Sequence, residues 1–371
     1  MQEKIFNVKN YWRNIDKQIL VSFSILFILG VFFSFSSTSF LADERLNKSY
    51  YFFFQKHLIY AFVSFLIMIL ISTLNTDLIN KSLIPIFIFF TLLLLLVPFF
   101  GAEVKGAKRW LNFYIFRFQP IEFVKPFFIL VVAQIISSTK IKSLNLSHVI
   151  SFLFLSIIAL LLLIQPDVGQ TILLAASWSS LIFISGFSII FLILIFFFLI
   201  VLFFLLLYLA PERFSYIITR ITSFMDPEKS GWSQSQKAIE AIKQGGLKGR
   251  GMGEGILKEN VPEAHTDYII AVVSEEFGSV VSVLIIIIFL FIAFRIIKKV
   301  ISFSDNYFKL ALCGLISLII FQTFIHIGVN ANLLPTTGMT LPFLSYGGSS
   351  LLSTGIVAGI ILNFTSLNEK N

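Results

Sequence analysis

Long stretches with few or no charged residues recur along the chain. They cover approximately residues 18–40, 57–75, 83–100, 120–138, 148–165, 168–186, 187–210, 268–294, 309–330 and 346–366. A helix needs about 20 apolar residues to cross the hydrocarbon layer of a bilayer, and most of these stretches are that long. Because lipid offers no hydrogen bonds, a single spanning segment must satisfy its own backbone, which favours helices. The pattern predicts an all-α, polytopic membrane protein with about ten transmembrane helices in one domain, residues 1–371.

Two longer polar segments interrupt this pattern, at residues 101–125 and 211–267. The apolar residues between 168 and 210 are too many for one crossing, and Ser185-Gly186 provides a hinge that divides them into two helices. Segment 211–267 is the only large piece outside the predicted spans. We therefore expect one large loop on a single face of the membrane, together with a shorter polar connection before the fourth span.

Composition supports the membrane interpretation. Hydrophobic residues make up 57% of the chain and charged residues 13%, whereas soluble proteins carry about 25% charged residues. This excludes an ordinary water-soluble enzyme. The formal net charge of +8 could suggest nucleic acid in a soluble protein, but here it indicates membrane topology or an anionic substrate. Cys313 is the only cysteine, which excludes disulfides within the chain and thiolate metal sites. No prosthetic metal is implied.

The distribution of lysine and arginine indicates the orientation. With residues 1–17 in the cytoplasm, the three short external loops carry only Arg45, Lys48 and Lys56. Short loops follow the positive-inside rule better than long ones. We therefore expect both termini in the cytoplasm and residues 211–267 as the large external loop. Segment 101–125 then carries net positive charge on the external face, against the rule, and an anionic partner gives a reason for it.

Segment 101–125 combines glycines, aromatic residues and five cations. The cations are Lys105, Lys108, Arg109, Arg117 and Lys125, against Glu103 and Glu122. One interpretation is a surface loop whose cations contact lipid phosphates. The other is a clamp for a diphosphate, which guanidinium groups bind through two oxygens at once. Glu122 and Lys125 are three residues apart at the start of a helix and therefore share a face, where they would neutralise each other.

Asp267 stands where the large loop returns to the membrane. Thr266 or Asp267 would make a good N-cap for the eighth span. The alternative is a general base, since activating a sugar hydroxyl needs a carboxylate at the membrane surface. His265 could also serve as a base, although positioning of the turn is the favoured interpretation. Glu259 and Glu263 are further candidates, and both could equally be solvated loop residues.

Three other features of the C-terminal half carry predictions. The glycines between residues 245 and 255 suggest a loop that lets backbone approach a ligand. Glu275 and Glu276 would lie about 12 to 13 Å further along the helix than Asp267, in the membrane, as a proton relay or, preferably, as hydrogen-bonding groups. The glycine and serine residues 347–350 open the last span, where Ser349 could help bind an anion or allow close helix packing.

Several segments together resemble one family. GAEVKGAKRW, FRFQPIEFVKP, QPDVGQTILL, SQKAIEAIKQGGLKGRGMGEG, VPEAHTDYIIAVVSEEFG and LLPTTGMTLPFLSYGGSS are similar to motifs of the shape, elongation, division and sporulation (SEDS) membrane glycosyltransferases. The resemblance runs from about residue 18 to 366, in the right order and spacing. The alanine in PEAHTD and the wording PTTGMTLPF resemble the division branch more than the elongation branch. Ile121 and Asn260 depart from the usual pattern.

This resemblance implies polymerisation of lipid II into glycan strands at the outer face of the cytoplasmic (inner) membrane. It implies that Asp267 is catalytic, that Glu259 matches an acidic motif position, and that Arg109 and Arg117 match basic ones. Lys125, Lys105 and Ser349 complete the expected substrate contacts. A divalent cation, Mg²⁺ or Mn²⁺, is plausible on the diphosphate, although no dedicated ligand cluster is visible. The implied partners are a class B penicillin-binding protein, which is a transpeptidase, and other division membrane proteins. No nucleic acid is expected.

Two other functions fit parts of the sequence. A flippase for lipid-linked precursor would need polar groups through the full membrane depth and two gated states, whereas the charges here concentrate on the outer face. A non-catalytic division scaffold would leave Asp267 as a helix cap. The charge distribution favours the enzyme.

Overall fold

The computed structural model describes most of the chain. The described residues are 14–46, 51–104, 107–113, 116–138, 144–188, 215–225, 234–261 and 263–367, with isolated positions 190, 193, 197, 201, 204 and 208. The predicted seventh span at 187–210 and the predicted contact residue Lys105 therefore lie largely or wholly outside them.

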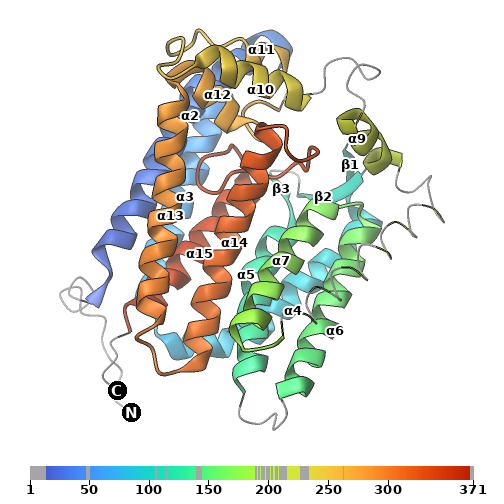
Figure 1. The fold of residues 1–371 in the computed structure, drawn as a ribbon, viewed down its shortest axis with the longest axis vertical. Helices are drawn as coiled ribbons and strands as arrows, with labels where there is room; N and C mark the ends of the chain where they lie inside the picture. Colours follow the sequence, from blue (N-terminus) through green and yellow to red (C-terminus); the bar gives the residue numbers. More distant parts are fainter. Residues whose placement is uncertain are drawn as a thin grey trace.

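Helices dominate the described part of the chain (Figure 1). Eight are long and apolar enough to cross a membrane. They are α2 (Lys17–Leu46), α3 (Phe52–Thr73), α4 (Thr76–Phe100), α5 (Pro120–Ser137), α6 (Leu144–Ile164), α13 (Ser279–Val300), α14 (Asn306–Asn330) and α15 (Gly348–Thr365). The shorter apolar helix α7 (Val168–Ile184) matches the sixth predicted span. The predicted helical, polytopic membrane fold is confirmed.

Two elements differ from the sequence prediction. The expected eighth span, 268–294, is two helices, α12 (Ile269–Phe277) and α13, because Gly278 between them has φ +90°. Segment 101–118 also forms an antiparallel sheet of β1 (Ala102–Val104), β2 (Ala107–Phe113) and β3 (Phe116–Phe118). These strands are too short to stand out from a loop in the sequence, and they are held by pairing and by packing of β2 on α4.

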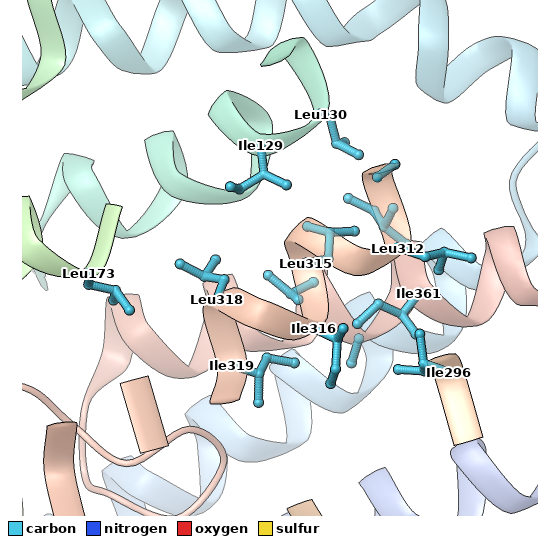
Figure 2. Close-up of a cluster of buried hydrophobic side chains, with 14 of the residues drawn as sticks. Ile129, Leu130, Leu173, Ile296, Leu312, Leu315, Ile316, Leu318, Ile319 and Ile361 are labelled. Atoms are coloured by element: carbon cyan, nitrogen blue, oxygen red, sulfur yellow. The ribbon is translucent and has the colours of Figure 1, made fainter. Parts of the chain in front are cut away.

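The core of the bundle is built around α14 and α5. Figure 2 shows side chains of α14 facing Ile129 and Leu130 of α5, Leu173 of α7, Ile296 of α13 and Ile361 of α15. In contrast, only 22% of the apolar window of α3 and of α4 is buried inside the protein. Exposed apolar side chains on these two helices form a surface suited to lipid.

Helices α15 and α3 pack closely through glycine. A Cβ at Gly355 would lie 2.4 Å from the carbonyl oxygen of Ser64, and one at Gly359 would lie 2.8 Å from the carbonyl oxygen of Met68. The two glycines are four residues apart and thus share one face of α15, which is the small-residue packing typical of membrane helices.

A second, smaller apolar cluster lies at one end of the bundle. Here α10 (Gln234–Gly245), α11 (Leu257–Asn260) and α12 pack together, through residues that include Ala238, Leu257, Tyr268 and Val272. Figure 1 shows these helices at the top of the view, with the strands and α9 (Ser215–Met225) at the same end. This end therefore gathers the polar segments that interrupt the spans in the sequence.

The glycine-rich loop after α10 is hydrogen-bonded to the C-terminal end of α12. Arg250 N donates to Glu275 O at 2.9 Å, Gly251 N donates to Glu276 O at 3.0 Å, and Ser279 N donates to Gly246 O at 2.9 Å. A Cβ at Gly249 would lie 2.3 Å from the carbonyl oxygen of Glu276. Gly249 thus allows close contact with another backbone, and approach of this loop to a ligand stays a prediction.

Glu275 and Glu276 act as hydrogen-bonding groups. The carboxylate of Glu275 accepts from Ile256 N at 2.9 Å and from Leu257 N at 3.0 Å. The carboxylate of Glu276 accepts from the Ser36 hydroxyl of α2. The favoured interpretation is therefore confirmed, but Glu275 bonds the large loop and α11 rather than a neighbouring spanning helix.

Candidate active site

Three charged side chains surround Gly338, in the loop between α14 and α15. A Cβ at this position would lie 3.9 Å from Asp267 Oδ2, 4.0 Å from Arg109 Nη1 and 4.0 Å from Arg220 Nη1. Gly338 has φ +75°, a backbone conformation that favours glycine. The carboxylate and both guanidinium groups, which come from three distant segments, therefore converge on one point.

Arg109 reaches this point from β2. Its Nε donates to Gln165 O at 3.4 Å, its Nη2 donates to Pro166 O, and its Nε lies 3.8 Å from Asp167 Oδ2. Burial raises the pKa of the Asp167 carboxyl, and the positive charge of Arg109 opposes this shift. Two carbonyl acceptors and the Asp167 carboxylate thus fix the Nε and Nη2 side of the guanidinium, while Nη1 lies at the Gly338 cluster, where it could bind an anion.

Arg220 comes from α9 and was not among the residues singled out from the sequence. Its Nη1 donates to Thr336 O at 2.6 Å, two residues before Gly338. Burial and the neighbouring charge of Arg109 lower the pKa of Arg220, while Asp267 and Glu263 act in the opposite direction. The signal that could have identified it is a single cation inside the otherwise uncharged helix SYIITRITSFM.

Asp267 lies one residue before the N-cap position of α12. The helix begins at Ile269, with Tyr268 at the N-cap position and no side-chain cap hydrogen bond. The Asp267 backbone N–H donates to Glu263 O at 2.9 Å. Burial raises the pKa of the neighbouring Tyr268 hydroxyl, and the negative charge of Asp267 adds to that shift. Tyr268, rather than Asp267, thus occupies the N-cap position, and Asp267 Oδ2 lies at the cluster around Gly338.

Three polar side chains on one face of α14 hydrogen-bond to the backbone segments that form the site. Gln322 Nε2 donates to Thr340 O at 2.8 Å, and His326 Nδ1 lies 2.9 Å from Met339 O. Asn330 Nδ2 donates to Asp267 O at 2.9 Å. These three residues are four positions apart and share one helix face. Sequence analysis missed them, although this spacing in an apolar helix was the available signal.

Lys125 is buried inside the bundle rather than presented at the surface. Its Nζ lies 2.9 Å from Glu122 Oε2 and donates to Gln170 Oε1 at 2.9 Å, while Gln170 Nε2 donates to Glu122 Oε1 at 2.8 Å. The Lys125 side chain is 1% exposed. The predicted mutual neutralisation of Glu122 and Lys125 is confirmed. Direct contact of Lys125 with a substrate stays a prediction.

The remaining predicted contacts do not join the cluster around Gly338 in the described structure. Arg117, on β3, has an exposed side chain. Ser349 is buried, accepts from Gln119 N at 3.1 Å and donates to Arg117 O at 3.4 Å. Ser349 thus joins α15 to β3 and to the residue before α5, and its contact with a substrate anion stays a prediction. Glu259 lies in α11, and its side chain is outside the described part, as is the whole of Lys105.

His265 positions the turn before Asp267. Its ring lies against Phe53 and Tyr346, with ring centroids 5.9 and 5.4 Å away, and its carbonyl oxygen accepts from Tyr346 N at 3.1 Å. Burial lowers the pKa of His265 to about 4, with Glu263 opposing the shift. The neutral imidazole therefore acts as a packing group, which confirms the favoured interpretation.

Comparison with known proteins decides the family. The family model FTSW_RODA_SPOVE, described as cell cycle protein, matches residues 16–370. The chain belongs to this family. A probable peptidoglycan glycosyltransferase FtsW of Caulobacter vibrioides (strain NA1000 / CB15N) is 35% identical over 353 residues, covering 95% of this chain and 89% of that protein.

Other relatives agree with this membership. A probable FtsW of Haemophilus influenzae is 32% identical, with 95% of this chain and 91% of that protein covered. Stage V sporulation protein E of Bacillus subtilis is 31% identical, with 94% and 96% covered. The SEDS resemblance is confirmed, and the FtsW names agree with the preference for the division branch.

Solved structures show the same fold. A chain of a peptidoglycan synthase complex that coordinates polymerization and crosslinking superposes with a TM-score of 0.77 at 23% identity, covering 95% of this chain and 97% of that one. The rod shape determining protein RodA of Thermus thermophilus superposes with a TM-score of 0.69 at 22% identity, with the same coverage. The FtsW/RodA fold therefore extends over nearly the whole chain.

Proposed function

We propose that this FtsW/RodA-family protein is a peptidoglycan glycosyltransferase that polymerises lipid II at the external face of the cytoplasmic membrane during cell division. The observation that carries the proposal is the convergence of the Asp267 carboxylate with the Arg109 and Arg220 guanidinium groups around Gly338. A glycosyl transfer from a lipid diphosphate needs one group that accepts a proton and others that stabilise a departing anion. These three side chains supply both.

In the proposed reaction Asp267 accepts the proton of the acceptor sugar's 4-hydroxyl. The oxygen attacks the anomeric carbon of the donor, the bond from that carbon to the diphosphate oxygen breaks, and the polyprenyl diphosphate leaves with the bonding electrons. Attack opposite the leaving group inverts the anomeric configuration. Arg109 and Arg220 stabilise the negative charge that develops on the diphosphate, and we extend this role to Arg117 from its family motif.

The arrangement of the arginines suits this role. Both donate to backbone carbonyl groups, Arg109 to residues 165 and 166 and Arg220 to residue 336. Their positions are therefore set before a substrate binds, so little reorganisation accompanies the reaction. Because one of these carbonyls belongs to the Gly338 loop, Arg220 is tied to the same loop that Asp267 faces.

The orientation follows from the two ends of the bundle. Asp16, just before α2, has its Oδ2 3.1 Å from Arg295 Nε of α13. Lys299, also on α13, donates to Thr365 O at the end of α15. The ends of the described chain thus meet far from Gly338, among cations that the positive-inside rule assigns to the cytoplasm. Both termini are accordingly proposed to be cytoplasmic and the Asp267 site external.

A divalent cation, Mg²⁺ or Mn²⁺, is proposed as a companion of the substrate diphosphate. Within the described residues there is no group of three or more histidine, cysteine, aspartate or glutamate side chains that could hold a metal ion. Mg²⁺ commonly binds through substrate phosphates with only one or two protein carboxylates. Asp267 and Glu263 are the carboxylates near Arg220 that could contribute. The cation would add positive charge beside the leaving diphosphate.

The proposed partner is a class B penicillin-binding protein, acting with other division membrane proteins. This chain makes only glycan in the proposed reaction, so crosslinking requires a second activity. The structural relative described as a peptidoglycan synthase complex couples polymerization to crosslinking, which supports the same division of labour here.

The deciding experiment measures polymerisation of purified lipid II by the full chain in detergent. We expect Asp267→Asn to abolish polymer formation, because the amide cannot accept the proton. The matched control is Asp305→Asn, at the opposite end of α14, where asparagine retains the N-cap hydrogen bond to Tyr307 N. Each protein is assayed with and without Mg²⁺ or Mn²⁺ and the cognate transpeptidase. A folded Asp267→Asn protein with normal output would exclude the base.

The flippase and scaffold alternatives give different results in the same system. A flippase moves labelled lipid II across liposomes and makes no polymer. A flippase would need charged groups inside the membrane, and the buried Glu122–Lys125 pair is a candidate for such groups. The pair lies, however, in the first two turns of α5, directly after the sheet that carries Arg109. It therefore belongs to the end of the bundle that holds the site, and the enzyme is favoured.

A further inference from the structure

Asn330, the last residue of α14, connects this helix to the backbone of Asp267. Its Nδ2 donates to Asp267 O at 2.9 Å and to His326 O at 2.8 Å, and its Oδ1 accepts from Ala271 N at 3.0 Å. The side chain is fully buried. One amide thus uses both of its donors and its acceptor, and two of the three bonds go to the segment that carries Asp267.

The bond to Ala271 reinforces the first turn of α12. The first N–H groups of a helix have no partner within the helix and usually bond a side chain at the N-cap. Tyr268 occupies that position and makes no such bond. The Ala271 N–H also donates to Tyr268 O at 3.0 Å, so Asn330 adds a second acceptor to the first turn of α12 from another helix, 59 residues further along the chain.

We propose that Asn330 is a positioning residue for glycosyl transfer, which holds the Asp267 peptide and the first turn of α12 so that the carboxylate faces Gly338. The inference rests on the proposed role of Asp267 as general base. The Asn330 side chain bonds both the Asp267 carbonyl and the N–H of Ala271, four residues later. It thereby fixes the orientation of the backbone between these two residues. Because α14 is one of the most buried helices, it gives this segment a rigid reference.

The reaction depends strongly on such placement. A displacement of about 1 Å at a reacting group can cost about 100-fold in rate. Loss of the Asn330 bonds leaves the guanidinium groups on their own carbonyl acceptors, so substrate binding should change little. The expected signature is a lower turnover number with an almost unchanged KM.

The chain contains a close match to Asn330 for use as a control. Asn363 of α15 is also buried, and its Nδ2 donates to the carbonyl oxygens of Ile71, Ser72 and Leu74 at the end of α3. It too fastens the end of one helix to another, but near Thr365, at the opposite end of the bundle. Replacement of either asparagine removes a similar number of hydrogen bonds.

The test compares Asn330→Leu, Asn330→Asp and Asn363→Leu for lipid II polymerisation and thermal unfolding. We expect both Asn330 variants to lower the turnover number ~10-fold to 100-fold, with KM within about twofold. Asn330→Asp keeps the size and the acceptor for Ala271 but loses the donors to Asp267 O, so it remains informative if Asn330→Leu folds poorly. Asn363→Leu should lower the melting temperature comparably while keeping turnover per folded molecule.

Two outcomes would overturn the proposal. One is turnover of both Asn330 variants equal to that of Asn363→Leu. The other is a loss of turnover in all three variants in proportion to lost stability, which would indicate a purely structural role. Asp267→Asn is measured alongside: if it polymerises like the wild type, the general-base role fails, whereas its inactivity beside normal Asn330 variants removes only the positioning role.

Discussion

Individual side chains at the end of the bundle that holds Asp267 are held in unusual states by burial. His265 is the clearest case, because its ring packs on Phe53 and Tyr346 and its pKa falls to about 4, below the usual 6.5. In the unfolded chain the imidazole binds a proton near its ordinary pKa, whereas in the folded protein it does so only at lower pH. The neutral ring therefore contributes stability that is fully present above about pH 6.5 and is lost as the pH falls toward 4.

The consequence is an acid-sensitive turn before Asp267. We expect the melting temperature of the wild-type protein in detergent to fall between pH 7.5 and pH 5, and that of His265→Phe to fall less, by a few degrees. Phenylalanine keeps the aromatic packing and removes the titratable group. The difference between the two curves isolates His265 from the other histidines, and parallel curves would contradict this explanation.

At the residue scale, sequence reasoning was sound for groups in contiguous motifs and incomplete for groups brought together by folding. Asp267 and Arg109 were identified by their motifs, and the structure brings them to one point. Arg220 was missed because its importance comes from its bond to Thr336 O, 116 residues away, which no local pattern reveals. Asn330 was missed for the same reason, because its bonds to Asp267 O and Ala271 N come from another helix.

Among the elements, the junction between α12 and α13 differs most from the sequence prediction. A stretch that is apolar except for Glu275 and Glu276 predicted one helix over 268–294, but Gly278 divides it and the loop after α10 packs on the break. A Cβ at Gly278 would lie 2.1 Å from Leu247 O. Such a contact between distant backbones leaves no hydrophobic pattern, so the break was not predictable from periodicity.

Substitution of Gly278 tests the contact between the glycine-rich loop and the end of α12. Gly278→Ala should destabilise the protein by more than Gly186→Ala, because the two glycines have nearly the same φ, +90° and +92°, but nothing lies within 4 Å of a Cβ at Gly186. The control therefore measures the strain of the backbone conformation, about 1 to 2 kcal/mol, and the excess measures the collision with Leu247 O.

Polymerisation activity provides a second comparison between Gly278→Ala and Gly186→Ala. Displacement of α12 would also move Asp267 at its other end, so Gly278→Ala should lose lipid II polymerisation while Gly186→Ala retains it. Equal melting temperatures and equal activities for the two variants would show that the glycine-rich loop does not hold α12 in place.

At the scale of the whole molecule, the order of the apolar helices in the described part of the chain was predictable because each span must satisfy its backbone alone. The arrangement at the two ends was not, since it depends on polar contacts between distant segments. At the end away from Gly338, Asp16 joins the start of α2 to α13. Its Oδ1 accepts from Gln18 N at 3.1 Å, and its Oδ2 lies 3.1 Å from Arg295 Nε and 3.7 Å from Lys299 Nζ.

This separation between the ends leads to a final prediction. Asp16→Asn should keep the cap at α2 but lose the charge, at a cost of about 1 kcal/mol because both cations are partly solvated. Asp16→Ala should lose the cap as well, for about 1 kcal/mol more. Arg295 is 17 residues beyond Gly278 on α13, or about 25 Å along the helix. Turnover per folded molecule should therefore stay at the wild-type level while the melting temperature falls in the order wild type, Asn, Ala. A loss of turnover in excess of the loss of folded protein would show that the Asp16 contacts and the Asp267 site are coupled through the bundle.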